Sequence, residues 1–379
     1  MNFSERSRLS GSRFLCLSLS NWFLNVYVCA LIPLIGAGGG GVLPFNGRAA
    51  CAVLAFAIGM LLPGPFCARL LECRSRKSVC LRALFWMGAL ALAGWHFSEF
   101  AYAVVAVYGL QGMCYGVAQM ALGSTLVNDV LMSPQRNRGD ILYAWAGRLG
   151  VPAGLLLGVL LLRLVPLGQA LLWVLLSCVV SFLLVAQTPV PVKAPVRMPL
   201  LTCDRFLLPR SLPLVLTVFA APFVMGAFLV RSGESVIALI ALAVAFVVVF
   251  GLQMLLRRRV SQLAAMTVGY LLSVAGLGVR TWFPQLPGEG MLACLAVGMG
   301  VAVVSSRHLM DWIAAASHCQ RGTAQNTCLL SWHLAFALGF AVANFAPGVP
   351  VWVYIACCLC SLAVYFGLWR RNWLHRNEG

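Results

Sequence analysis

Apolar runs of roughly 20 residues follow one another from Phe14 to Trp369. At a rise of about 1.5 Å per residue, each run is long enough to cross a hydrocarbon core of about 30 Å as a helix. Only 10% of the residues are charged, whereas soluble domains carry about 25%. The chain is therefore predicted to be an all-α, polytopic membrane protein.

The runs and the segment between the sixth and the seventh predict the domain organisation. We place the spans at residues 14–37, 49–71, 78–96, 99–127, 141–162, 168–187, 211–230, 234–256, 261–281, 290–310, 324–346 and 350–369. The segment TPVPVKAPVRMPLLTCDRFLLPR is rich in proline, which interrupts helices. We therefore expect 12 transmembrane helices in two six-helix bundles, over residues 1–187 and 211–379, joined by a cytoplasmic linker over 188–210.

The basic residues predict the orientation. The 27 Lys and Arg exceed the 10 Asp and Glu, and they gather between runs in clusters such as CRSRK, PQRNRGD and RRR. Such clusters are typical of short cytoplasmic loops. The alternate loops hold at most one arginine each: Arg48, Arg163, Arg231 and Arg280. Both termini are therefore expected in the cytoplasm, and the positive charge indicates membrane topology rather than binding to nucleic acid.

The stretch ARLLECRSRK, residues 68–77, resembles the loop between spans two and three of the major facilitator superfamily, Gly-x-Leu-x-Asp-Arg-x-Gly-Arg-Arg/Lys. The matching positions are Leu70, Glu72, Arg76 and Lys77, and the departures are Ala68, Cys73 and Ser75. The stretch NDVLMSPQRNRGDILYAWAGRLGVPAG resembles the junction of spans four and five in that family. The stretch QRGTAQNTCLLSWHLAFALG resembles the start of span eleven in its bacterial drug and sugar efflux members. The resemblance implies the family's fold and transport by alternating access.

The resemblance also implies a set of gating residues. In this family the loop carboxylate is thought to lie near the start of span eleven, while its basic neighbours pair with an acid at the end of span four. The residues implied here are Glu72, Arg74, Arg76, Lys77 and Asp129. A carboxylate is stabilised by the positive end of a helix by about 0.3–1 kcal/mol, so Glu72 is expected to face the helix start at Gly322. The alternative is that the charge of this loop serves topology alone.

Polar side chains within the spans indicate a substrate path, because such groups are costly in lipid and usually face a cavity or a partner helix. On spans one and four they recur every four residues and so share one helical face. With groups from spans five and eleven, the candidates are Asn21, Asn25, Gln111, Tyr115, Gln119, Trp145, Arg148, Trp332 and His333. Helix packing is the alternative for each, and Arg148 could instead extend to the inner membrane surface.

All the acidic residues fall at termini, in loops or at span ends, so we expect none near the membrane midplane. If protons drive transport, the candidates for coupling are Asp129, Asp311 and His333. The chain has no GxxxxGK[ST] loop, which argues against a nucleotide-driven pump. Its cysteines lie mostly within apolar runs and form no paired CxxC motif, so we expect neither a metal nor another cofactor.

Together these features predict a secondary active transporter of a small molecule, and not an enzyme. We expect an efflux permease of a bacterial inner membrane that works as a monomer in the lipid bilayer. One alternative is a degenerate sensor or scaffold that does not transport. A second is an integral-membrane transferase with Arg307, His308 and Asp311 as its polar cluster, although a structural ion pair between Arg307 and Asp311 explains the same residues.

Overall fold

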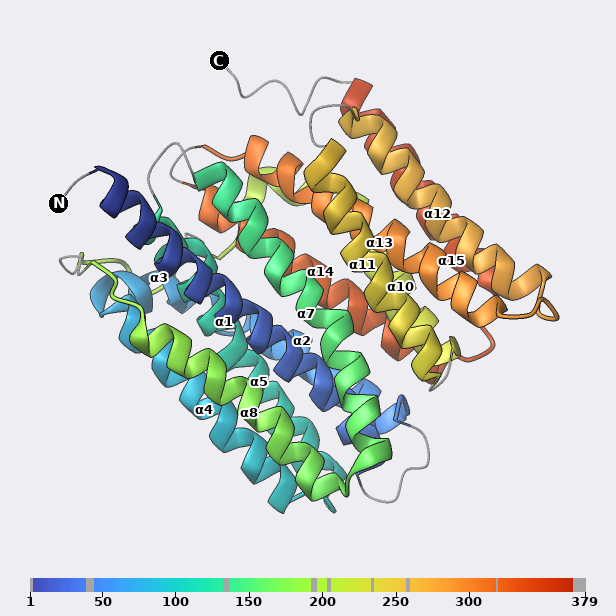
Figure 1. Cartoon of the computed structure of the whole chain (residues 1–379), viewed down its shortest axis with the longest axis horizontal. Helices are drawn as coiled ribbons and strands as arrows, with labels where there is room; N and C mark the ends of the chain where they lie inside the picture. Colours follow the sequence, from blue (N-terminus) through green and yellow to red (C-terminus); the bar gives the residue numbers. More distant parts are fainter. Residues whose placement is uncertain are drawn as a thin grey trace.

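The computed structural model describes residues 3–38, 44–131, 136–191, 196–202, 206–232, 235–256, 260–317 and 320–370. Two groups of long helices lie side by side (Figure 1). The first group comprises α1 (Phe3–Ala37), α2 (Gly47–Leu61), α3 (Gly64–Cys73), α4 (Arg76–His96), α5 (Ala101–Ala121), the π-helical turn η1 (Leu122–Leu126), α6 (Val127–Val130), α7 (Arg136–Leu164) and α8 (Leu167–Gln187). The second comprises α9 (Leu212–Val218), α10 (Ala220–Ser232), α11 (Val236–Leu256), α12 (Gln262–Trp282), α13 (Glu289–Ala314), α14 (Arg321–Phe345) and α15 (Val351–Arg370).

The number of spans follows from length and composition. Among the residues that the structure describes, eleven helices are long and apolar enough to cross a membrane, and the bent pair α2 and α3 makes twelve if it is counted as one span. That pair bends by 54° next to Pro63, because proline lacks the backbone N–H that would continue the helix. The predicted polytopic fold of 12 helices in two six-helix bundles is confirmed. The start of α1 and the end of α15 lie at the same end of the molecule, which we call the inner end (Figure 1).

Glycine allows α7 to pack closely on α1. A Cβ atom at Gly150 would lie 2.6 Å from the carbonyl oxygen of Trp22, and one at Gly154 would lie 2.5 Å from that of Val26. Neither gap can hold a side chain, so glycine at these two positions is what allows the contact. Small residues at a membrane helix interface let backbones approach and gain dispersion contacts.

Several predicted span boundaries differ from the structure. The span expected at 99–127 is one continuous span over Ala101–Val130. It contains the π-helical turn η1, where Ser124 Oγ donates a hydrogen bond to the Met120 carbonyl and Thr125 Oγ1 donates to the Ala121 carbonyl. These hydroxyls compete with the backbone for its own acceptors. The span expected to begin at residue 141 begins instead at Arg136, because hydropathy marks the lipid boundary whereas the helix continues past it.

The two groups meet along a central interface. Helix α2 packs against α14 and α7 packs against α11, with further contacts of α13 on α7 and of η1 on α14. The candidate site lies at this interface.

Candidate functional site: a cavity between the two bundles

Two adjoining cavities lie between the bundles. The first, which we call the aromatic cavity, is lined chiefly by apolar residues of α1, α2, α5 and α14. The second, the polar cavity, is lined by residues of α1, α7, α13 and α14 and contains Asn21, Asn25 and Arg148. Both cavities are lined by Trp332 and His333, so α14 forms the wall between them.

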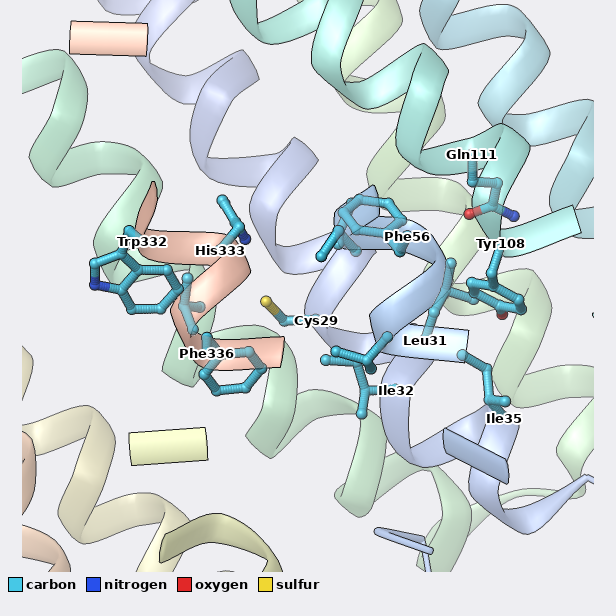
Figure 2. Close-up of a pocket in the computed structure, with 14 residues that line it drawn as sticks. Cys29, Leu31, Ile32, Ile35, Phe56, Tyr108, Gln111, Trp332, His333 and Phe336 are labelled. Atoms are coloured by element: carbon cyan, nitrogen blue, oxygen red, sulfur yellow. The ribbon is translucent and has the colours of Figure 1, made fainter. Parts of the chain in front are cut away.

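One face of α14 supplies the wall contributed by the C-terminal bundle. Its lining residues are Gln325, Cys328, Leu329, Trp332, His333 and Phe336. Their spacing of three or four residues places them on a single helical stripe. Figure 2 shows Trp332, His333 and Phe336 on one side of the aromatic cavity, facing Phe56, Tyr108 and Gln111 across residues of α1.

A chain of hydrogen bonds orders the amides of the N-terminal bundle. Asn25 Nδ2 donates to Asn21 Oδ1 at 2.9 Å, and Gln119 Nε2 donates to the same oxygen at 2.8 Å. Asn21 Nδ2 donates to the Tyr143 carbonyl at 2.9 Å, and the Tyr143 hydroxyl donates to Gln119 Oε1 at 3.2 Å. Each of these hydrogen bonds pairs a donor with an acceptor. Together they fix the rotation of α1, α5 and α7 about their axes relative to one another.

The chain continues into the C-terminal bundle through Tyr115. Its hydroxyl donates to Asn25 Oδ1 at 2.8 Å and lies 3.1 Å from His333 Nε2. A hydroxyl carries one proton, and the Tyr115 hydroxyl donates that proton to Asn25 Oδ1. The tyrosine oxygen must therefore accept in its second hydrogen bond, with His333 Nε2–H as the donor. The predicted residues Asn25, Tyr115 and His333 are thereby brought together across the interface.

Arg148 is the one charged residue among those that line the two cavities. Its Nη1 atom is buried and has no hydrogen-bond partner within the described parts of the chain. The side chain of Cys328 forms a hydrogen bond with the guanidinium. No aspartate or glutamate is among the lining residues of either cavity, so the polar cavity carries a net positive charge.

Three of the predicted path residues line neither cavity: Tyr115, Gln119 and Trp145. Trp145 is fully buried between α7 and α11, where its Nε1 donates to Gln253 Oε1 at 2.9 Å and its ring packs on Phe250. It is absent from the lining of both cavities, because its ring is held against α11. The residues of span five alone did not show that α11 supplies these contacts. Gln111 lines the aromatic cavity, with its Oε1 accepting from Tyr27 at 3.4 Å and its Nε2 unpaired among the described residues.

At the inner end, three side chains form a group that we call the inner brace: Glu72, Arg76 and Asp129. Arg76 Nη2 donates to both carboxylate oxygens of Glu72 at 2.7 and 2.6 Å, and Nη1 donates to Asp129 Oδ2 at 2.8 Å. Arg76 therefore joins the inner ends of α3, α4 and α6. Nearby, Lys77 Nζ donates to the carbonyls of Ala186 and Thr188 at 2.7 and 2.8 Å, whereas Arg74 is exposed.

The start of α14 closes the inner end against η1. A Cβ at Gly322 would lie 2.8 Å from Ser124 Cα, so the two backbones are in contact. The segment after α8 crosses the same end. The Phe206 ring packs directly on Gly64 and leaves no room there for a Cβ atom. The Phe206 carbonyl accepts a hydrogen bond from Asn326 Nδ2 at 3.2 Å. This segment thus connects α3 of one bundle with α14 of the other.

The opposite end is also closed. The rings of Phe45, just before α2, and Phe340, on α14, meet edge to face with centroids 5.9 Å apart. Both side chains are buried. The two bundles therefore meet at both ends of the interface through different residues, and we call these contacts the inner and the outer closure.

The C-terminal bundle holds a second polar cluster, around Asp311. Asp311 Oδ2 accepts from Gln262 Nε2 at 3.2 Å and from the Tyr365 hydroxyl at 3.1 Å, with His308 Nδ1 3.9 Å away. Arg307 is buried beside it. This cluster joins α12, α13 and α15 and contributes no lining residue to either cavity. Within the described ranges, no three His, Cys, Asp or Glu side chains are grouped as a metal site.

No protein-family model matches the chain, and no curated protein matches it in sequence. Solved structures, however, share its architecture. The human organic anion transporter MFSD10 (TETRAN) aligns with 95% of this chain and 99% of its own, with a TM-score of 0.63 and 18% identity. At this identity the likeness establishes the fold and not the activity.

A bacterial homologue of the iron transporter ferroportin is similar as well. Its outward-facing structure covers 95% of this chain and 98% of its own, with a TM-score of 0.64 and 16% identity. The same protein with soaked iron gives a TM-score of 0.62 over 94% of this chain and 98% of its own, again at 16% identity. The chain therefore has the major facilitator fold and is a multi-pass membrane protein.

Proposed function

We propose that this protein is a secondary active transporter that carries a small molecule across the membrane by alternating access. The observation that carries the proposal is the pair of cavities between the two bundles, lined by polar groups from both. Ligand sites of transporters with this two-bundle organisation lie near the midplane at the interface of the repeats. Rocking of one bundle against the other would open the cavity to each side in turn.

The two closures are the proposed gates. Opening the inner end would separate α14 from η1, and opening the other end would separate Phe340 from Phe45. The inner brace and Lys77 hold the inner ends of the N-terminal bundle in the shape against which α14 closes. Arg74, which is exposed in the same loop, contributes its positive charge to topology.

We further propose that the protein belongs to the major facilitator superfamily and acts as an efflux permease of a bacterial inner membrane, with both termini in the cytoplasm. The proposed division is residues 1–187, a linker over 188–210, and residues 211–379. Support comes from the basic loops, the start of span eleven and the shared fold. The protein is proposed to work as a monomer and to require no cofactor.

Protons are the proposed driving ion. Of the three candidates, His333 is the one that lines the cavities, Asp129 belongs to the inner brace, and Asp311 lies in the polar cluster of the C-terminal bundle. Replacement of the coupling residue by Asn or Gln is expected to abolish the dependence of transport on a pH gradient while leaving exchange of substrate intact.

Transport in everted membrane vesicles tests the proposal. A mixed panel of metabolites and drugs is presented with and without an imposed pH gradient, against vesicles that lack the protein. Accumulation that depends on the gradient supports a proton-coupled exporter, whereas accumulation that ignores it points to facilitated diffusion or to another coupling ion. If no compound accumulates and the protein is inserted normally, the sensor or scaffold alternative is favoured. Turnover of an added acyl or glycosyl donor would instead favour the transferase.

A further inference from the structure

We infer that the cavity is built for an amphipathic organic anion, whose acidic group binds Arg148 while its apolar body occupies the aromatic cavity. This inference deepens the proposed function and rests on it. It assigns a substrate class and places each part of the substrate in a particular cavity.

The first argument concerns charge. A guanidinium held away from bulk water is costly unless an opposite charge compensates it. The described lining of the two cavities offers none, and the buried Nη1 of Arg148 is without a partner among the described residues. A carboxylate or sulfonate would accept from Nη1 and supply the missing charge, because Arg recognises planar oxyanions through charge-assisted hydrogen bonds.

The second argument concerns the other polar groups. The side-chain N–H groups of Asn21 and Asn25 are engaged within the protein, at 2.9 Å to the Tyr143 carbonyl and to Asn21 Oδ1 respectively. They hold the wall of the polar cavity in place and do not compete for a ligand. Arg148 is the one charged donor that a ligand meets in the polar cavity, which selects for an acceptor with negative charge.

The third argument concerns the apolar part. The aromatic cavity adjoins the polar one at Trp332 and His333, and its wall includes Phe56, Tyr108 and Phe336 (Figure 2). Rings and alkyl groups bind favourably on such a wall through area burial and aromatic contacts. A molecule with its acid at Arg148 and a ring or chain beyond Trp332 would fill both cavities.

The test compares two probes of the same shape and different charge, 2-naphthoate and 2-naphthamide. Binding to the full-length protein in phosphatidylcholine nanodiscs is measured by equilibrium dialysis, with empty nanodiscs subtracted. Naphthoate is expected to bind about tenfold more tightly or better, since a hydrogen bond to a charged group contributes about 1.5–3 kcal/mol. Arg148→Gln is expected to remove this preference, and Arg148→Lys to keep part of it.

The matched control is Arg163→Gln, which makes the same charge change in the last turn of α7 at an exposed position outside both cavities. It is expected to leave the naphthoate preference unchanged. Equal affinity for the two probes, or a preference that survives Arg148→Gln, would overturn the inference. Loss of naphthoate binding when phosphatidylglycerol replaces phosphatidylcholine would also overturn it, because a lipid headgroup would then be the anion that Arg148 holds.

Transport of the two probes in proteoliposomes separates this inference from the proposed function. An anion preference that depends on Arg148 without any transport supports the subsite and contradicts the transporter. Transport with equal rates for both probes supports the transporter and contradicts the subsite.

Discussion

Replacing Arg76 by glutamine should destabilise the inner end of the N-terminal bundle far more than replacing its neighbour Arg74. Arg76 bridges Glu72 and Asp129 through contacts of 2.6 to 2.8 Å. The three side chains are buried, with 9%, 9% and 7% of their surfaces exposed for Arg76, Glu72 and Asp129. The substitution breaks both of these ion pairs and removes the positive charge that joins the two carboxylates.

The expected size follows from that burial. Removing one partner of a buried ion pair costs about 3–5 kcal/mol, because the remaining charge is left uncompensated. An exposed substitution such as Arg74→Gln should stay within about 0.5 kcal/mol. The double variant Arg76→Gln/Asp129→Asn removes both members of one ion pair, so its loss of stability should be smaller than the sum of the two single losses.

Reversible unfolding of the purified protein in mixed micelles, followed by tryptophan fluorescence, gives the free energy of unfolding for each variant. Arg74→Gln controls for the change in loop charge and for membrane insertion. The reasoning is refuted if Arg76→Gln loses no more stability than Arg74→Gln, or if the double variant loses the full sum.

The two closures give further predictions, each measured by the alkylation rate of a cavity cysteine in a background where the other cysteines are serine. Gly322→Leu places a side chain against the η1 backbone and should separate α14 from η1. Cys328, which lines the polar cavity, should then react faster with an impermeant maleimide added at the inner side. The control is Gly251→Leu, because a Cβ at Gly251 meets nothing within 4 Å. Phe340→Ala should speed the reaction of Cys29 from the opposite side and leave its reaction from the inner side unchanged. A Gly322→Leu rate equal to that of Gly251→Leu, or Cys29 reactivity that is insensitive to Phe340, would show that these contacts do not close the cavity.

Features of the fold that depend on local sequence could be predicted. Hydropathy and proline mark the spans, and the basic clusters sort the loops, because each signal is carried by neighbouring residues. The π-helical turn could not be predicted in the same way. It depends on whether the hydroxyls of Ser124 and Thr125 turn back to the backbone, and most membrane helices tolerate such residues without a break.

For the candidate site, the sequence could predict only which residues share one face of a helix. The spacing of Asn21 and Asn25 places them on one face, and both line the polar cavity. Gln325 and Cys328 were missed, although their spacing to Trp332 already put them on the same stripe of α14. The orientation of Trp145 toward α11 depends on how two distant spans pack, and a single helix carries no information about its neighbours.

Alternating access is the central claim, and pulsed electron paramagnetic resonance distances between two pairs of spin labels test it most directly. One pair reports on the outer closure, with labels on the exposed native Cys51 of α2 and on Phe345→Cys of α14. The other reports on the inner closure, with labels at Asn128→Cys of α6 and Gln320→Cys before α14, again with all other cysteines replaced. The account predicts that each pair shows a short and a long distance, and that conditions which lengthen one shorten the other. A single unchanging distance in both pairs, or lengthening of both together, would contradict it.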